Sequence, residues 1–249
     1  MSLKTDRTSL RSKTRRVAGR LEKFLGVPIQ TAPLPAALDM LIATILSQNT
    51  NDTNSHRAYT QLRRKYPTWN SVARARLRSV VAAIRTGGMA NQKGERIQNV
   101  LSDVRAAYGA YDLSSLEAKS NEEVVAELTR FNGVGIKTAA CVLLFSMGRD
   151  VFPVDTHVHR ICSRLGLALR CTTPEQTFEA MKSLVPRGKG HSFHTNLIRF
   201  GRRVCRANNP ACNACPLFSE CVYEKKTSAP AARRALPRAH YDFMLLDNV

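Results

Sequence analysis

Residues 137–147, KTAACVLLFSM, constrain the fold more than any other segment because they are apolar on nearly every side. A helix of this composition must be covered by other elements of the protein. The segment at residues 35–52 offers such cover, since helical spacing puts five aliphatic side chains on one stripe: Leu38, Leu41, Ile42, Ile45 and Leu46. No alternating strand pattern of useful length occurs in the sequence. It therefore predicts an all-α fold around a buried central helix.

The rest of the chain between residues 21 and 224 continues the helical pattern. Further helices are predicted at residues 55–65, 71–85, 92–108 and 121–131, and others that start near Thr156, Pro174 and His191. The two ends differ in composition. Residues 1–20 are rich in Ser, Thr, Lys and Arg and are predicted to form a flexible basic arm. Residues 225–249 have the Ala, Pro and Arg content of an extended basic tail.

Positive charge is the main clue to a partner. The chain has 38 Lys and Arg against 19 Asp and Glu, a net charge of +19. The two ends hold +6 and +3 of this charge, which leaves +10 on residues 21–224. A basic folded body suits a polyphosphate partner, and nucleic acid is favoured over an anionic membrane because no strongly amphipathic basic helix is evident. No apolar run of membrane-spanning or signal-peptide type occurs, so an intracellular protein is expected.

The stretch FNGVGIKTA at residues 131–139 places a Gly-x-Gly turn between two predicted helices. The first amides of the second helix have no acceptors within the helix and lie at the positive end of its dipole. The corner therefore predicts an anion site, here for a DNA phosphate. Lys137 lies at the same helix start, where the dipole and the apolar helix behind it favour an uncharged amine. A neutral amine is a nucleophile, although Lys137 could also serve as a phosphate contact, and the corner could be a plain helix–turn–helix.

Four of the seven cysteines form a compact group with the spacing Cys-x6-Cys-x2-Cys-x5-Cys: Cys205, Cys212, Cys215 and Cys221. Four thiolates within 17 residues suit a tetrahedral metal centre, and spacing alone leaves zinc and iron–sulfur open. Asp155 in PVDTH precedes a predicted helix, and its simplest role is that of an N-cap. His157 and His159 fall on different helix faces and predict no metal site.

Taken together, LSQNTND at 46–52, GGMANQKGERI at 87–97, FNGVGIKTA, FPVDTHVHRI at 152–161 and the cysteine group resemble the endonuclease III family of helix-hairpin-helix DNA glycosylases. The resemblance implies two helical lobes with a cleft between them. One is a six-helix barrel with the hairpin, residues 30–149, and the other is an iron–sulfur lobe, residues 21–29 and 150–224, with its cluster loop at 205–221. It also implies one [4Fe–4S] cluster on the four cysteines and a monomer that binds duplex DNA holding a damaged base or an abasic site.

In this resemblance Lys137 is the nucleophile and Asp155 its acidic partner, in a bifunctional glycosylase and abasic-site lyase for oxidised pyrimidines. The DNA contacts that it implies are Asn49, Met89, Asn91, Lys93, Gly133, Val134, Gly135 and Thr138. Asn49 would fill the gap left by a flipped base, and Met89 would act as a wedge. Three positions depart from the family pattern: Asn49 replaces Gln, Thr129 replaces Glu, and Asn132 replaces a Pro and should loosen the turn.

Three alternatives stay open at this stage. The same fold could remove another base, such as adenine or a mismatched thymine or uracil. A non-catalytic DNA-binding module would keep the hairpin and the charge, but it would have no use for Lys137 and Asp155 together. An electron-transfer iron–sulfur protein would gain nothing from a charge of +19.

Overall fold

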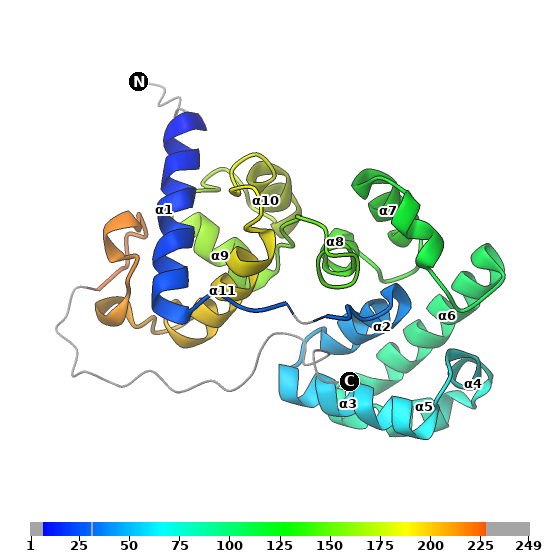
Figure 1. Ribbon diagram of the computed structural model, residues 1–249. Helices are drawn as coiled ribbons and strands as arrows, with labels where there is room; N and C mark the ends of the chain where they lie inside the picture. The colour runs from blue at the N-terminus through cyan, green and yellow to red at the C-terminus, as the bar shows by residue number, and fades with distance from the viewer. Residues whose placement is uncertain (1–6, 31, 228–249) are drawn as a thin grey trace. The chain divides into compact units, whose positions relative to one another are not determined.

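The computed structural model describes residues 7–30 and 32–227, and every regular element in these ranges is helical. The prediction of an all-α fold is confirmed for this part of the chain. The chain divides into two compact units (Figure 1). We call residues 30–149 the hairpin unit, and the described residues 7–29 together with 150–227 the cysteine unit. None of the helices in the described ranges has the length and apolar character of a membrane span.

The hairpin unit consists of seven described α-helices and two short 3₁₀ helices. In chain order they are α2 (Ala37–Ser47), α3 (Asp52–Lys65), α4 (Trp69–Arg74), α5 (Leu77–Ala83), η1 (Arg85–Gly87), α6 (Ala90–Tyr108), η2 (Ser114–Ala118), α7 (Asn121–Leu128) and α8 (Ile136–Phe145). The last eight residues of α8 are all buried, so the prediction of a buried helix at this position is confirmed. α8 packs against α2 and α7. The predicted aliphatic stripe of α2 is buried as well, with each of its five side chains at most 2% exposed.

One predicted helix of this unit proved to be two. The sequence predicts a single helix over residues 71–85, but Ala75 and Arg76 are extended and separate α4 from α5. The side-chain amide of Gln98, on α6, donates hydrogen bonds to Val72 O (3.0 Å) and Ala75 O (2.8 Å). These bonds satisfy carbonyls at the end of α4 that a continuing helix would have used. Because the donor comes from a distant segment, hydrophobic periodicity could not reveal the break.

The cysteine unit consists of four described α-helices and a loop with two 3₁₀ turns. They are α1 (Arg7–Leu25), α9 (Thr156–Arg164), α10 (Pro174–Met181), α11 (Gly190–Arg203), η3 (Cys212–Ala214) and η4 (Phe218–Glu220). α11 is the centre of this unit: it packs against α1 and α9, and most of its residues from Gly190 to Gly201 are buried. The starts predicted near Thr156, Pro174 and His191 agree with the observed helices to within one residue.

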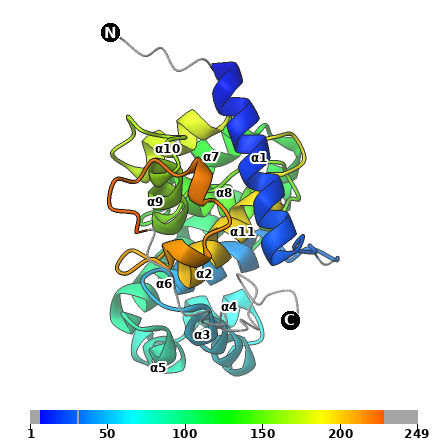
Figure 2. The ribbon, with the colours of Figure 1, turned by 90° about the vertical axis from the view of Figure 1, so that its left-hand side faces the viewer.

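The prediction of a flexible arm over residues 1–20 was wrong for residues 7–20, which belong to α1. Thr14, Val17, Ala18 and Leu21 form a buried stripe at helical spacing, and the many basic residues between them obscured this pattern in the sequence. α1 packs against α11, and Figure 2 shows the cysteine loop beside α1. Arg16 forms an ion pair with Glu220 of that loop (3.0 Å). Residues 1–6 and 228–249, which hold the rest of the predicted arm and most of the predicted tail, lie outside the described residues.

Candidate functional site

The Gly-x-Gly corner is a tight turn between α7 and α8. The Val134 N–H donates to Phe131 O at 3.0 Å, and Gly133 has φ of +80°, so residues 131–134 form a type II turn. Glycine is required at Gly133 because other residues rarely adopt this conformation. Gly135 differs: its φ of −97° and ψ of 176° are open to any residue, and an added Cβ would meet no atom within 4 Å. Of the two glycines in this corner, Gly133 has a positive φ and Gly135 does not.

Gly135 is the N-cap of α8 and has no side chain to occupy the first amides of the helix. The N–H groups of the first turn therefore keep their capacity to bind an anion. The side chains of Val134 and Thr138 are buried, at 5% and 4% exposure. If these two residues contact DNA as predicted, they do so through backbone amides. Lys137 is the second residue of α8 and is half-buried.

Asp155 is the N-cap of α9. Its Oδ1 accepts a hydrogen bond from the Val158 N–H at 2.8 Å, and the side chain is half-buried. The predicted N-cap role of Asp155 is thus observed. The hydrogen bond from Val158 anchors the carboxylate at one of its two oxygens. Lys137 belongs to the hairpin unit and Asp155 to the cysteine unit. Their pairing stays a prediction.

Asn49 and Met89 come from segments 40 residues apart and lie side by side. The Asn49 side-chain amide is 3.5 Å from the Met89 sulfur, and both residues are exposed. Both have left-handed backbone conformations, with φ of 52° and 50°. This conformation costs a methionine on the order of 1–3 kcal/mol, and such strain is concentrated at functional sites. A shared role of the pair at the DNA stays a prediction. Asn91, which is also exposed, is the second residue of α6, whose N-cap is Met89.

Lys93 requires a correction. Its side chain is 2% exposed, and its ammonium donates hydrogen bonds to Leu46 O (2.7 Å) and Gly87 O (2.8 Å). A buried ammonium with two backbone partners is not available for a phosphate. Instead, Lys93 joins the end of α2 to the turn before Met89. Burial, assisted by the charge of Arg96, lowers the pKa of Lys93 to about 8.

Replacing Lys93 with Met should destabilise the protein by about 2 kcal/mol, because two buried carbonyls would lose their donor. The substitution should also change how the free energy of unfolding depends on pH. Between about pH 8 and the ordinary lysine pKa near 10.4, the unfolded chain retains a proton that folded Lys93 has released, so this group makes stability rise with pH. Urea unfolding at several pH values should show both effects. Arg85→Met, which removes an exposed cation from the same turn, should change stability by less than about 0.5 kcal/mol.

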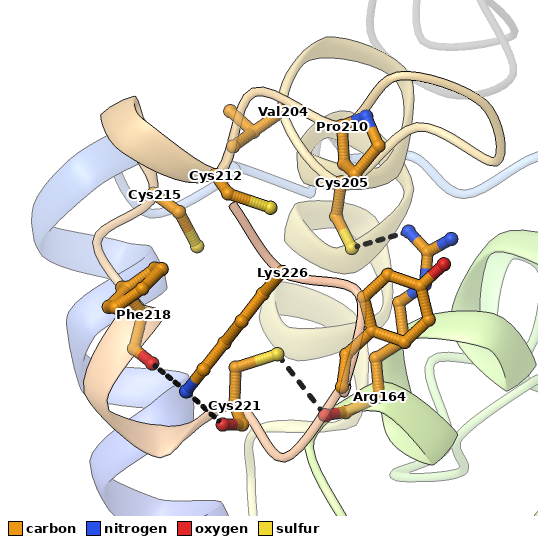
Figure 3. A pocket seen from close by; sticks show the side chains of 10 residues that line it. Arg164, Val204, Cys205, Pro210, Cys212, Cys215, Phe218, Cys221 and Lys226 are labelled. Carbon is orange, nitrogen blue, oxygen red and sulfur yellow. Dashed lines mark hydrogen bonds between the residues drawn. The ribbon is translucent and has the colours of Figure 1, made fainter. Parts of the chain in front are cut away.

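The four grouped cysteines line one cavity. Figure 3 shows the side chains of Cys205, Cys212, Cys215 and Cys221 around it, together with apolar walls from Val204, Pro210 and Phe218. Arg164, Tyr223 and Lys226 complete the lining. In the described residues, no three or more His, Cys, Asp or Glu side chains are placed so that they could hold a single metal ion. In the thiol form, burial raises the pKa of Cys215 to about 12.

Arg164 is a site residue that sequence reasoning missed. Its Nη1 donates to Cys205 Sγ at 3.4 Å and to Arg206 O at 2.8 Å, and its Nη2 donates to Ala207 O at 3.0 Å. The guanidinium thus holds the loop after the first cysteine and places a positive charge beside its sulfur. Lys226 secures the other end, where its ammonium donates to Cys221 O at 2.7 Å. Neither residue is part of the cysteine motif, so its spacing gave no signal for them.

The two histidines of VDTHVH behave as structural residues. The Nδ1 of His157 lies 3.1 Å from Arg160 Nη2, and burial lowers the pKa of His157. His159 instead contacts Thr177 of α10, with 2.7 Å between Nδ1 and Oγ1. As expected from their spacing, the two side chains contact different partners.

Comparison with known proteins agrees with this geometry. Residues 42–187 match the HhH-GPD superfamily of base excision DNA repair proteins. The chain is 36% identical to endonuclease III of Thermotoga maritima over 199 residues, which cover 80% of this chain and 89% of that protein. It is 39% identical over 151 residues to a putative DNA glycosylase of Arabidopsis thaliana, of which it covers 52%. A solved endonuclease III–DNA complex has a TM-score of 0.72 and 25% identity, over 85% of this chain and 95% of that chain.

The superfamily match defines the class: a helix-hairpin-helix protein of base excision repair. Within this class, the chain belongs to the endonuclease III family of DNA glycosylases and abasic-site lyases. A thermostable thymine-DNA glycosylase has the same TM-score of 0.72 at 21% identity, which shows that this glycosylase shares the fold.

Proposed function

We propose that this protein removes oxidised pyrimidines from duplex DNA inside the cell, as a monomer, and cuts the strand 3′ to the resulting abasic site. The observation that carries the proposal is the position of Lys137. It is the second residue of a helix that starts directly after the type II turn and whose N-cap has no side chain. A phosphate on the open amides and an amine within the same turn of helix would meet at one nucleotide.

The proposed reaction begins when the damaged base leaves the duplex stack. The Lys137 amine, once it has lost its proton, attacks C1′ of the sugar as the bond from C1′ to the base breaks, and the base leaves with a proton. Asp155 stabilises the positive charge that develops on the sugar and assists the proton transfers. Opening of the sugar ring gives a Schiff base between Nζ and C1′. Loss of a proton from C2′ then breaks the bond between C3′ and its oxygen, which cuts the strand.

A panel of duplexes tests the choice of base. Each duplex would hold one oxidised pyrimidine, a mismatched thymine or uracil, or an adenine opposite an oxidised purine. We expect the oxidised pyrimidines to be released with the largest kcat/KM. A larger value for mismatched thymine would instead favour the alternative that this protein removes thymine, as in the thymine-DNA glycosylase that shares its fold. If no base is released from any duplex while the protein still binds DNA, the result would favour a non-catalytic DNA-binding protein.

We also propose that the four cysteines of the cavity hold one [4Fe–4S] cluster. A single zinc ion at about 2.3 Å from each sulfur would need the sulfurs within about 4 Å of one another. A cubane instead takes one thiolate for each of four separated irons, and the single Cys-x2-Cys pair of this group, Cys212 and Cys215, differs from the two short pairs that are usual in zinc sites. The positive side chains of Arg164 and Lys226 offset the charge of the thiolates. Once bound, the cluster would shape the loop at 205–221 for DNA contact.

The purified protein should therefore be brown, with broad absorption near ~400 nm from thiolate-bound iron. Cys215→Ser should remove most of this absorption, and Cys171→Ser should leave it unchanged, because Cys171 lies outside the group. A colourless protein that contains one equivalent of zinc would contradict the assignment.

A further inference from the structure

Arg96 of α6 contacts two segments to which the proposed function gives separate tasks. Its Nη1 donates to Gln48 Oε1 at 2.5 Å, and Gln48 directly precedes Asn49. Its side chain also lies against the hairpin turn: a Cβ added to Gly133 would overlap Nε, Cδ and Cζ of Arg96. One guanidinium therefore bridges the predicted gap-filling loop and the predicted phosphate-binding turn.

The hairpin turn needs such support. A type II turn favours proline at its second position, where the fixed φ removes alternative conformations from the chain. Asn132 occupies this position and supplies no such restraint. The planar guanidinium of Arg96 lies against the third position of the turn, at Gly133, and lines one polar cavity together with Asn132. Packing from α6 thus replaces the covalent restraint that a proline would give.

The loop on the other side of Arg96 is strained. Asn49 of this loop and its neighbour Met89 both have left-handed backbone conformations, and the surrounding structure must hold them in place. Lys93, one turn of α6 before Arg96, fixes the ends of both segments through Leu46 O and Gly87 O. Arg96 extends this set of contacts to Gln48 and onward to the hairpin. Consecutive turns of α6 therefore connect the wedge, the gap-filling loop and the hairpin within one unit.

From these contacts we infer that Arg96 is a positioning residue that couples the hairpin turn to the Asn49 loop, so that phosphate capture and filling of the vacated base position occur together. The inference rests on the proposed function, because it takes the DNA roles of Asn49 and the hairpin from there. Arg96 acts here through Gln48 and Gly133. A direct bond from Arg96 to a DNA phosphate is the competing explanation, and it makes different predictions.

The test uses the full-length protein and duplex DNA that contains a stable abasic analogue. A 2-aminopurine placed opposite the analogue reports local unstacking through its fluorescence. Arg96→Met should lower the preference for abasic over undamaged DNA about 10-fold and reduce the fluorescence increase on binding, since coupling between sites is typically about 5- to 150-fold. The slope of log affinity against log salt should stay unchanged. Arg96→Lys should not restore the preference, because an ammonium cannot reproduce the planar fork.

Two further variants make the test specific. Asn132→Pro in the Arg96→Met background should recover most of the lost preference, because proline restrains the turn directly. Gln48→Met should reproduce the loss seen in Arg96→Met, and it serves as the test if the arginine variant fails to fold. The matched control is Arg105→Met, which removes an exposed cation from the same helix and should match the wild type.

The inference is overturned if Arg96→Met lowers the salt slope by about one and Arg96→Lys restores it, because this result identifies a phosphate contact. It is also overturned if Arg96→Met and Gln48→Met both behave like Arg105→Met. Failure of the proposed function would look different, since the wild type itself would then show no preference for the abasic duplex.

Discussion

Lys137→Ala should abolish the covalent adduct that borohydride forms between the protein and duplex DNA holding an abasic site. Borohydride reduces the imine of a Schiff base to a stable amine, so the adduct requires a nucleophilic nitrogen at the sugar. We expect at least an approximately 10³-fold loss of adduct, measured by the shifted band on a denaturing gel, because alanine offers no nitrogen in its place. Strand cleavage should be lost to the same extent.

Binding separates this chemical role from a role in affinity. Removal of one cation should reduce the slope of log affinity against log salt by at most about one. Arg130→Gln is a matched control, because it removes an exposed positive charge just before the hairpin turn. It should retain the adduct. If Lys137→Ala traps as well as the wild type, the nucleophile is another amine, and the proposed mechanism is wrong.

Asp155→Asn should lower base release and adduct formation by about 10²- to 10³-fold with little change in stability. Asparagine caps a helix as well as aspartate does, so the hydrogen bond from the Val158 N–H should persist. What the substitution removes is the negative charge and the ability to accept a proton. Single-turnover rates on duplexes with an oxidised pyrimidine, together with thermal unfolding, would measure both effects.

Thr173→Asn gives the corresponding control in the same unit, because Thr173 caps α10 through an accepted hydrogen bond from Gln176. Exchange of one capping residue for another at that helix should change neither rate nor stability appreciably. A wild-type rate in Asp155→Asn would leave Asp155 as a cap alone.

The features that the sequence determined depend on residues that lie close together in the chain. The all-α fold, the buried helix at 137–147 and the cysteine spacing follow from periodicity and from residue types within a few turns of helix. The four motifs at residues 46–52, 87–97, 131–139 and 152–161, taken together with the cysteine group, predicted the endonuclease III family, and the similarity to known members of that family confirmed it. A helix cap at Asp155 was likewise evident from its neighbours alone.

Tertiary structure decided what depends on residues far apart in the chain. Lys93 was predicted to contact DNA, but carbonyls of Leu46 and Gly87 close around its ammonium. Residues 7–20 were predicted to belong to a flexible arm, but they form most of α1, which has a buried stripe and packs against α11. No role for Arg96 could be predicted from the sequence, because the residues that it contacts, Gln48 and Gly133, lie 48 residues before it and 37 residues after it. A side chain's neighbours within one helix can be read from spacing, but burial and long-range partners depend on how the helices pack.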